Sequence, residues 1–404
     1  MAVTLADVAA RARVSTATVS RVLNGNYPVA ESTRARVLRA VADLEYVVNG
    51  PASALAAAAS DLVGILVNDI ADPFFGIIAS AVQSELSAAN GRHIDGGAAP
   101  RTGDGDTRRS PGGGPALVPA GEKLAVVCNT GGSPERELTY LTLLQRQRAA
   151  AVVLTGGAVK DADHAAAVTA ALTRLTAAGT RVVLCGRPPV SPESGAWEAR
   201  PVSGTYTDLE ARIFQRAVRK APVAPSPITL AFDNRGGARR LTEHLISLGH
   251  RHIGYVAGPA GRTTTRHRLE GHREALSAHG IPDPAHRTVH GAYDRAAGYD
   301  ATLELLRRDS TLTAIVAAND TAALGVCAAL RDRGLRIPGD ISVAGFDDLP
   351  FSADAVPALT TVRLPLQEAG ARAGRLAMGR EMPPPGEIAT IHGDLVVRDS
   401  TSAP

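Results

Sequence analysis

Polar and aromatic side chains recur just beyond short apolar runs that have the length of buried strands. In open α/β sheets, ligands bind outside the carboxyl ends of the strands, so these side chains are candidates for one ligand site. Asn, Asp and Arg together supply the donors and acceptors that buried hydroxyl groups need, and aromatic rings offer flat apolar faces. The combination favours a neutral polyhydroxylated ligand. The candidates are Phe74, Arg187, Asp233, Arg268, Tyr293, Asn319 and Asp347.

Several of these candidates have an ordinary structural alternative. Phe74 starts a helical stretch and can belong to the core beneath that helix. Arg187 and Arg268 can form ion pairs between two lobes of the molecule. Asp320, which follows Asn319, can cap the next helix. The pattern by itself leaves these alternatives open.

Motifs for catalysis and for metal binding are missing from the sequence. It has no Walker loop, no H-E-x-x-H and no nucleophile elbow. Gly131-Gly132 and Gly156-Gly157 follow apolar runs but lack the dinucleotide-binding spacing, so we interpret both pairs as turns. The histidines between 244 and 279 have no carboxylate or cysteine partners at ligand spacing. We therefore expect no enzyme, no cofactor and no metal site.

The elements that must position the candidates alternate along the chain. Helical periods such as 135–146, 236–248, 266–279 and 320–333 separate the apolar runs. Such alternation is typical of βαβ units with parallel sheets, and so many strands fit two sheets better than one. The predicted fold is therefore an α/β core of two doubly wound parallel-sheet lobes. The predicted strands are 62–67, 124–127, 151–154, 181–184, 229–232, 252–257, 314–317 and 341–345.

Two stretches interrupt this alternation of predicted strands and helices. Residues 91–122 are dense in glycine, proline and charge, and we expect a loop without its own core. Residues 188–227 are proline-rich at both ends and are predicted to carry a short helix at 208–220. We expect the first lobe to hold 62–186 and 350–380, and the second to hold 228–348 and the C-terminal strands. The second insertion would then lie on the first crossing between the lobes, and both insertions are interpreted as tolerated surface additions.

The first 48 residues form a different pattern, with three short helices predicted at 4–12, 16–23 and 32–44. Two short helices, a tight turn and a bracing third helix are typical of a helix-turn-helix. On the outer face of the second helix, Arg21 can donate two hydrogen bonds to guanine, and Thr16 and Ala17 can contact thymine. A plain three-helix bundle is the alternative. The DNA-binding candidates are Thr4, Ser15, Thr16, Ala17, Thr18, Ser20, Arg21, Asn24 and Thr33.

Composition limits what this chain can bind and where it can work. Its 43 basic and 40 acidic residues give a net charge of only +3, so nucleic-acid contact requires a local surface. Three separated cysteines indicate reduced thiols, and the N-terminus lacks the apolar core of an export signal. No apolar stretch is long enough to span a bilayer. We expect a cytoplasmic protein with no membrane contact.

The segment Val3 to Ala9, followed by Val14 to Gly25, closely resembles the N-terminus of the lactose-repressor-type (LacI/GalR) transcriptional regulators. The resemblance implies a helix-turn-helix head at 1–48, a hinge at 49–61 and a ligand-binding, dimerising core at 62–404, similar to periplasmic sugar-binding proteins. On the same resemblance, Leu55 wedges into the minor groove of the operator. Arg268, Asn319 and Asp347 become the leading effector contacts.

Two residues depart from the pattern of that family. Arg13 stands in the turn where the family usually has glycine; if φ is positive there, arginine costs about 1 kcal/mol. Ser53 stands where the hinge usually carries an arginine. These departures motivate the alternative of an altered regulator with weakened DNA binding.

The combined expectation is a repressor that binds a near-palindromic operator as a homodimer. A small molecule, expected to be a sugar, would bind between the lobes and control operator affinity. A solute-binding protein is the first rival, but it would need an export signal and no DNA-binding head. A doubly wound enzyme is the second, and no nucleophile, base or cofactor loop can be assembled for it.

Overall fold

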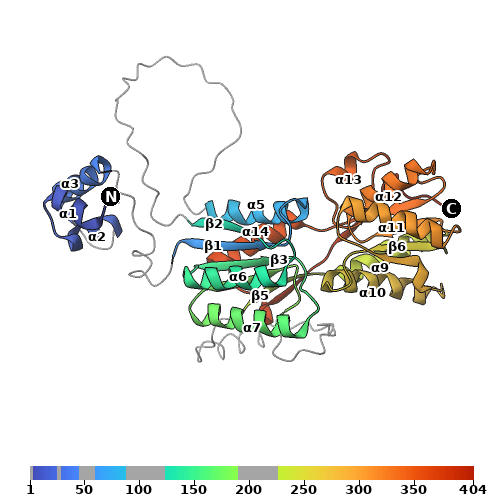
Figure 1. Cartoon of the computed structure of the whole chain (residues 1–404), viewed down its shortest axis with the longest axis horizontal. Coiled ribbons are helices and arrows are strands. Elements are labelled where there is room, and N and C mark those ends of the chain that lie inside the picture. The colour runs from blue at the N-terminus through green and yellow to red at the C-terminus, as the bar shows by residue number, and fades with distance from the viewer. Residues whose placement is uncertain (1–2, 25–28, 45–59, 88–122, 190–225) are drawn as a thin grey trace, which may run out of the picture.

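The computed structural model describes residues 3–24, 29–44, 60–87, 123–189 and 226–404, and everything below refers to these residues. Three predictions fall outside them: the hinge with Ser53 and Leu55, the first insertion, and nearly all of the second insertion with its helix at 208–220. The described chain forms a small helical head and a core of two α/β lobes (Figure 1).

The head contains the three predicted helices, α1 (Leu5–Ala12), α2 (Thr16–Asn24) and α3 (Glu31–Asp43). Each of these helices has an apolar face, and the three faces form one core in which Val8, Val19 and Val37 are fully buried. The turn between α1 and α2 has a left-handed residue, Arg13, with φ 54° and ψ 51°. The positive φ that would disfavour arginine in this turn is therefore present.

The first lobe is built on a six-stranded parallel sheet with the order β11-β5-β4-β3-β1-β2. Alternate side chains of these buried strands point to opposite faces, so both faces need a helical cover. Helices α5 (Pro73–Ser87) and α14 (Leu366–Met378) cover one face, and α6 (Pro134–Arg146) and α7 (Ala162–Ala177) cover the other (Figure 1). The strands are β1 (Leu62–Val67), β2 (Leu124–Asn129), β3 (Ala151–Thr155), β4 (Arg181–Cys185), β5 (Ile228–Phe232) and β11 (Ile388–Ile391).

The second lobe has a four-stranded parallel sheet with the order β7-β6-β8-β9. Helices α9 (Asn234–Ser247) and α10 (Thr263–Ala278) pack on one side, and α11 (Arg295–Arg308) and α12 (Asp320–Asp332) pack on the other (Figure 1). A short antiparallel pair, β10 (Thr361–Arg363) with β12 (Asp394–Val396), completes the described strands. The sheet strands are β6 (Ile253–Ala257), β7 (Thr288–His290), β8 (Ala314–Ala317) and β9 (Ser342–Ala344); α13 (Phe351–Asp354) follows them.

The expected division into lobes was wrong at three places. Strand β5 belongs to the first sheet, because Ile228 pairs with Val183 of β4. Strand β11 also joins the first sheet as the neighbour of β5. Residues 351–359 belong to the second lobe, where the Ser352 hydroxyl donates to Asp320 at 2.7 Å and Leu359 packs beside α12. The second insertion therefore joins two strands of one sheet and does not lie on a crossing between lobes.

Candidate functional site

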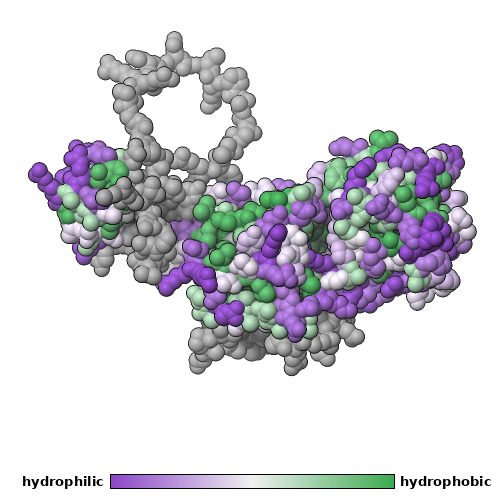
Figure 2. All heavy atoms as spheres, in the orientation of Figure 1, coloured by the Kyte–Doolittle hydropathy of each residue, from purple (hydrophilic) through white to green (hydrophobic). Residues whose placement is uncertain are grey.

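A cavity of about 330 Å³ lies between the two lobes, at the carboxyl ends of their strands. The surface is recessed where the lobes meet (Figure 2). Segments that follow β1, β2, β3, β4 and β5 line the cavity from the first lobe, and segments that follow β6, β7, β8 and β9 line it from the second. Such a position, outside the carboxyl ends of parallel strands, is where ligands bind in open α/β folds.

Five of the seven predicted ligand residues line this cavity, although they come from five separate segments of the chain. They are Phe74, Arg268, Tyr293, Asn319 and Asp347. Phe74, Tyr293, Asn319 and Asp347 lie in segments that directly follow strands, and parallel strands bring their carboxyl ends to the same edge of a sheet. Arg268 lies within α10 instead.

Arg268 is buried, with 3% of its surface exposed, and each guanidinium nitrogen has a protein partner. Its Nε donates to Asn234 Oδ1 at 2.8 Å, Nη1 to the Ala318 carbonyl at 2.5 Å and Nη2 to Asp347 Oδ1 at 2.8 Å. The guanidinium also lies 3.8 Å from the centroid of the Phe346 ring. These contacts hold the charged guanidinium in one position at the wall of the cavity.

Asp347 has an unusual backbone and an unusual acidity. Its φ is 109°, a region that side chains other than glycine rarely adopt and that costs on the order of 1–3 kcal/mol. Burial raises the pKa of Asp347 to about 7, and Arg268 opposes that rise. The raised pKa follows from the burial of this carboxyl group inside the lobe.

Asn319 and Asp320 divide two structural tasks between them. Asn319 caps α12, since its Oδ1 accepts from the Ala322 N–H at 2.9 Å, and its Nδ2 donates to the Tyr293 carbonyl at 3.2 Å. The carboxylate of Asp320 instead accepts from Leu349 N–H, Ser352 and Thr361. Burial raises the pKa of Asp320 to about 6 despite these donors. The cap that was predicted as an alternative for Asp320 is thus supplied by its neighbour.

Aromatic rings form the apolar part of the cavity wall. Phe74 and Phe75 meet edge to face with centroids 5.0 Å apart, and Phe74 meets Phe232 at 6.0 Å. Tyr293 lies on the opposite lobe, and its hydroxyl is 2.7 Å from Thr265 Oγ1. Phe74 is thus both a buried core residue and part of the cavity wall.

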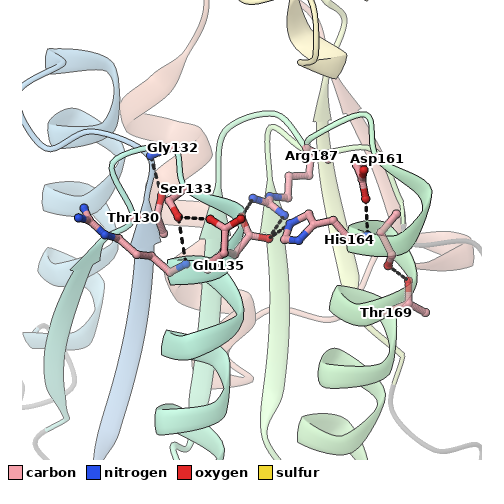
Figure 3. A network of polar contacts seen from close by, with 12 residues as sticks. Thr130, Gly132, Ser133, Glu135, Asp161, His164, Thr169 and Arg187 are labelled. Carbon is pink, nitrogen blue, oxygen red and sulfur yellow. Dashed lines mark hydrogen bonds and ion pairs between the residues drawn. The ribbon is translucent and has the colours of Figure 1, made fainter.

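Arg187 lies outside the cavity, in a polar network within the first lobe (Figure 3). Its Nη1 and Nη2 donate to the two carboxylate oxygens of Glu137 at 2.8 and 2.5 Å. His164 Nε2 lies 3.6 Å from the same carboxylate. Burial works against the charge of Glu137, but Arg187 outweighs it and lowers the pKa of Glu137. The pairs of Arg187 and Arg268 each lie within one lobe, so the alternative of ion pairs between lobes was wrong.

Asp233 also lies outside the cavity, because it is used as the cap of α9. Its Oδ1 accepts from the Gly236 N–H at 2.8 Å, and its Oδ2 lies 3.0 Å from His392 Nδ1. Although burial raises it, these hydrogen bonds lower the pKa of Asp233 overall. The next residue, Asn234, lines the cavity instead.

Several residues that line the cavity are not among the seven predicted ligand residues. Asp72 and Asn234 follow strands, so their strand-end signal was available. Arg262 and Thr264 flank the start of α10, and nothing in their local sequence distinguishes them from surface residues. The lining residues missed in this way include Asn68, Asp69, Asp72, Asn234, Arg262, Thr264 and Asp294.

The head presents the predicted DNA-binding candidates on and around α2. Thr16, Ala17 and Arg21 are exposed, and Thr18 and Ser20 are half-buried. Ser15 begins the helix by accepting from the Thr18 N–H at 3.2 Å, as its position predicts. Asn24 ends α2, and Leu55 lies outside the described residues.

The two candidates on the other head helices have local roles as well. Thr4 caps α1 in a reciprocal capping box with Asp7, and it is exposed. Thr33 lies half-buried in the first turn of α3.

Neither a metal-binding cluster nor a membrane-spanning helix occurs in the described ranges. These ranges hold no group of three or more His, Cys, Asp or Glu residues arranged to bind a metal. The helices described are too short or too polar to cross a membrane. The three cysteines, Cys128, Cys185 and Cys327, are buried free thiols, and burial raises the pKa of each.

Comparisons with known proteins cover the whole chain. Residues 4–49 match the bacterial regulatory proteins of the lacI family, and residues 242–401 match a periplasmic binding protein-like domain. The HTH-type transcriptional regulator GalR of Escherichia coli (strain K12) is 31% identical over 403 residues, which cover 99% of this chain and 96% of that protein. The regulator MalR of Streptomyces coelicolor is 31% identical over 412 residues, covering 100% and 98% of the two chains.

Solved structures agree with these matches. The lac repressor dimer bound to operator and the anti-inducer ONPF has a TM-score of 0.69 and 25% identity, with 100% of both chains covered. The complex of the transcriptional regulator CelR with cellobiose has a TM-score of 0.60 and 27% identity, covering 98% of this chain and 99% of that one. With its helix-turn-helix head, its two-lobed core and relatives of this identity over the full length, the chain belongs to the lacI family of bacterial regulatory proteins.

Proposed function

We propose that this protein is a repressor whose affinity for a near-palindromic operator is controlled by a small polyhydroxylated molecule, a sugar in the first instance. The observation that supports the proposal is that the protein has both an exposed helix-turn-helix face and a separate cavity between the two lobes of the core. Arg21, Thr16 and Ala17 stand out from α2, where base edges of the major groove would meet them.

The chemistry of the cavity favours a sugar as the effector. Phe74 and Phe232 supply apolar ring faces, and Asn68, Asp72 and Asp294 supply hydrogen-bonding groups around them. One structural neighbour is a regulator in complex with cellobiose. We assign effector contact to Phe74, Arg268, Tyr293, Asn319 and Asp347.

A homodimer would place two heads over the two half-sites. Strand β2 ends the first sheet and exposes three apolar side chains, with Leu124 at 64%, Val126 at 37% and Val127 at 36%. Figure 2 shows hydrophobic residues gathered on this part of the lobe. A second copy of the chain would bury this surface, and one structural neighbour is a dimer on its operator.

We propose one role for each of three consecutive segments of the chain. Residues 1–48 bind DNA in the cytoplasm, 49–61 form a hinge whose Leu55 enters the minor groove, and 62–404 bind effector and dimerise. For regulation, the effector must bind one arrangement of the two lobes more tightly than the other, and the operator must also bind the protein more tightly in one of these arrangements. Opposite preferences make the effector an inducer, and matching preferences make it a corepressor.

A random-pool DNA selection with the full-length protein tests this proposal. We expect enrichment of a near-palindromic site, and a change in its affinity when sugars are added in a panel. Enrichment of no sequence, with or without sugars, would overturn the proposal. A specific site bound only weakly would favour the altered regulator that Arg13 and Ser53 suggest.

A further inference from the structure

The turn between α1 and α2 holds an arginine in a backbone conformation that glycine adopts most easily. The Val14 N–H donates to the Ala9 carbonyl at 3.0 Å, and the Arg13 N–H donates to the Ala10 carbonyl at 3.2 Å. This pair of hydrogen bonds is a Schellman motif, which ends a helix on a left-handed residue that is usually glycine. Val14 packs against the core of the head and holds the turn in place. The fold therefore imposes the positive φ on Arg13.

Residues with positive φ follow seven α-helices in the described part of the chain, and five of these residues are glycine. Glycine adopts this conformation readily because it has no Cβ. The two exceptions are Arg13 after α1 and Arg148 after α6, where the chain has a backbone cost that glycine would remove. The glycines are Gly179 after α7, Gly249 after α9, Gly280 after α10, Gly334 after α12 and Gly379 after α14.

The Arg13 side chain extends into solvent. The residue is exposed, and among the described residues no oxygen atom accepts a hydrogen bond from its guanidinium. Arg11, two residues earlier, differs because its Nη2 donates to Asp43 of α3 at 2.7 Å. No contact within the described structure thus offsets the backbone cost at Arg13. An unfavourable backbone conformation beneath a free cationic side chain points to a contact outside the protein.

The position of the turn indicates the nature of this contact. Arg13 stands two residues before Ser15, which caps α2, and Thr16 and Ala17 are exposed at the start of that helix. In a helix-turn-helix, this end of the second helix lies in the major groove. A helix with its side chains is about 10–12 Å across and the groove is about 12 Å wide, so the helix fills the groove. The turn just outside the helix then lies at the edge of the groove, where the phosphates are.

We propose that Arg13 contacts a phosphate of the DNA backbone and strengthens DNA binding by the head. A guanidinium can donate two parallel hydrogen bonds to a phosphate, and its charge displaces counterions from DNA. The described head has six arginines and three acidic residues, and Arg13 adds to this local excess of positive charge. Such a contact fixes the position of the head on the duplex without reading its sequence. The inference rests on DNA binding by the proposed repressor, and it opposes the alternative in which Arg13 weakens that binding.

The salt dependence of binding to a mixed-sequence DNA duplex tests this contact, because a phosphate contact acts on every sequence. Fluorescence anisotropy with the full-length protein gives the affinity at several salt concentrations for the parent and for Arg13→Gly. We expect the slope of log affinity against log salt to become shallower by about 0.9 for each bound head, with a loss of about five- to tenfold in affinity at about 0.1 M salt. Arg13→Lys keeps the positive charge and should keep most of the slope.

The stability of the same variant separates a lost contact from a damaged head. Arg13→Gly removes a Cβ from a residue with positive φ, so its melting temperature should equal or exceed that of the parent. Weaker DNA binding by a head that is at least as stable cannot come from unfolding. If Arg13→Gly melts at a lower temperature, Arg13→Gln replaces it in the salt series, because glutamine keeps a long side chain and removes the charge.

Arg11→Ala is the matched control. It removes the same charge from the last turn of α1, at a residue whose guanidinium is engaged with Asp43. Its salt slope should equal that of the parent. An unchanged slope and affinity in Arg13→Gly would overturn the contact, and so would equal losses in Arg13→Gly and Arg11→Ala. Tighter binding by Arg13→Gly would also overturn it and would favour the altered regulator.

These measurements use neither an operator nor an effector. A random-pool selection that enriches no sequence would remove the proposed function, and a shallower slope on mixed-sequence DNA would still stand. An unchanged slope in a protein that does enrich an operator would remove the Arg13 contact alone.

Discussion

Arg268 and Asp347 stand 79 residues apart in the sequence and form a buried ion pair with an Nη2 to Oδ1 distance of 2.8 Å. The pair joins α10 to the segment that follows β9, and both residues line the cavity. Because each residue is 3% exposed, neither charge has water as an alternative partner. The same contact therefore serves both the stability of the lobe and the shape of the ligand site.

Removing one member of this pair should destabilise the lobe strongly. Asp347→Ala leaves the Arg268 charge buried without its partner, and we expect a loss of about 3–5 kcal/mol in the free energy of unfolding. Urea denaturation measures the loss. The control is Asp340→Ala, which breaks the exposed pair with Arg336 and should leave stability close to that of the parent. Equal effects of the two substitutions would contradict the assigned role of burial.

The left-handed backbone at Arg13 destabilises the head, and a glycine at this position should remove that cost. Its φ of 54° is left-handed, so Arg13→Gly should raise the stability of the head by about 1 kcal/mol. Thermal melting followed by circular dichroism measures the change. In Arg36→Gly, inside α3, the same new residue occupies ordinary helix and should lower stability by about 1 kcal/mol. A destabilised Arg13→Gly protein would show that the side chain of Arg13 outweighs its backbone cost.

Operator recognition should depend on Arg21. Once the random-pool selection has defined a site, Arg21→Ala should weaken specific binding by about 1–3 kcal/mol and relax one base position. Fluorescence anisotropy with the selected site and with single-base variants measures both effects. A uniform loss across all variants would place Arg21 on a phosphate instead of a base.

The acidity of Asp320 predicts how stability depends on pH. Its pKa in the folded protein is about 6, against an ordinary value of 3.8, so the folded state holds this proton more tightly than the unfolded chain. The stabilisation that comes from this tighter proton binding is fully present below about pH 4. It is lost as the pH rises through 6, which lowers the free energy of unfolding by about 3 kcal/mol. The difference in unfolding free energy between the parent and Asp320→Asn isolates it. A difference that does not vary between pH 4 and 7 would refute the raised pKa.

Local features of the sequence located most of the secondary structure and much of the cavity. The helix periods in the head, the run at 62–67 and the strand-end positions of Asn319 and Asp347 all depend on neighbours close in the chain. The family resemblance drew attention to Arg13, whose cost was conditional on a positive φ, and the structure has that positive φ. The family resemblance carried by residues 3–25 identified the type of regulator.

Contacts between residues far apart in the chain decided which sheet each strand joins and which polar side chains reach the cavity. Whether β5 extends the first sheet or begins the second depends on its register with β4, which its own residues do not encode. Arg187 and Asp233 follow strands as predicted, but the Arg187 side chain donates to Glu137 and the Asp233 side chain caps α9. Arg262 stands in the second lobe, but its side chain donates to the Gly132 carbonyl of the first lobe, a contact that exists only where the two lobes meet. The sequence by itself thus determined which elements form and what kind of site they carry, and only the tertiary structure decided which polar groups remain for a ligand, because partners distant in the chain compete for the same hydrogen bonds.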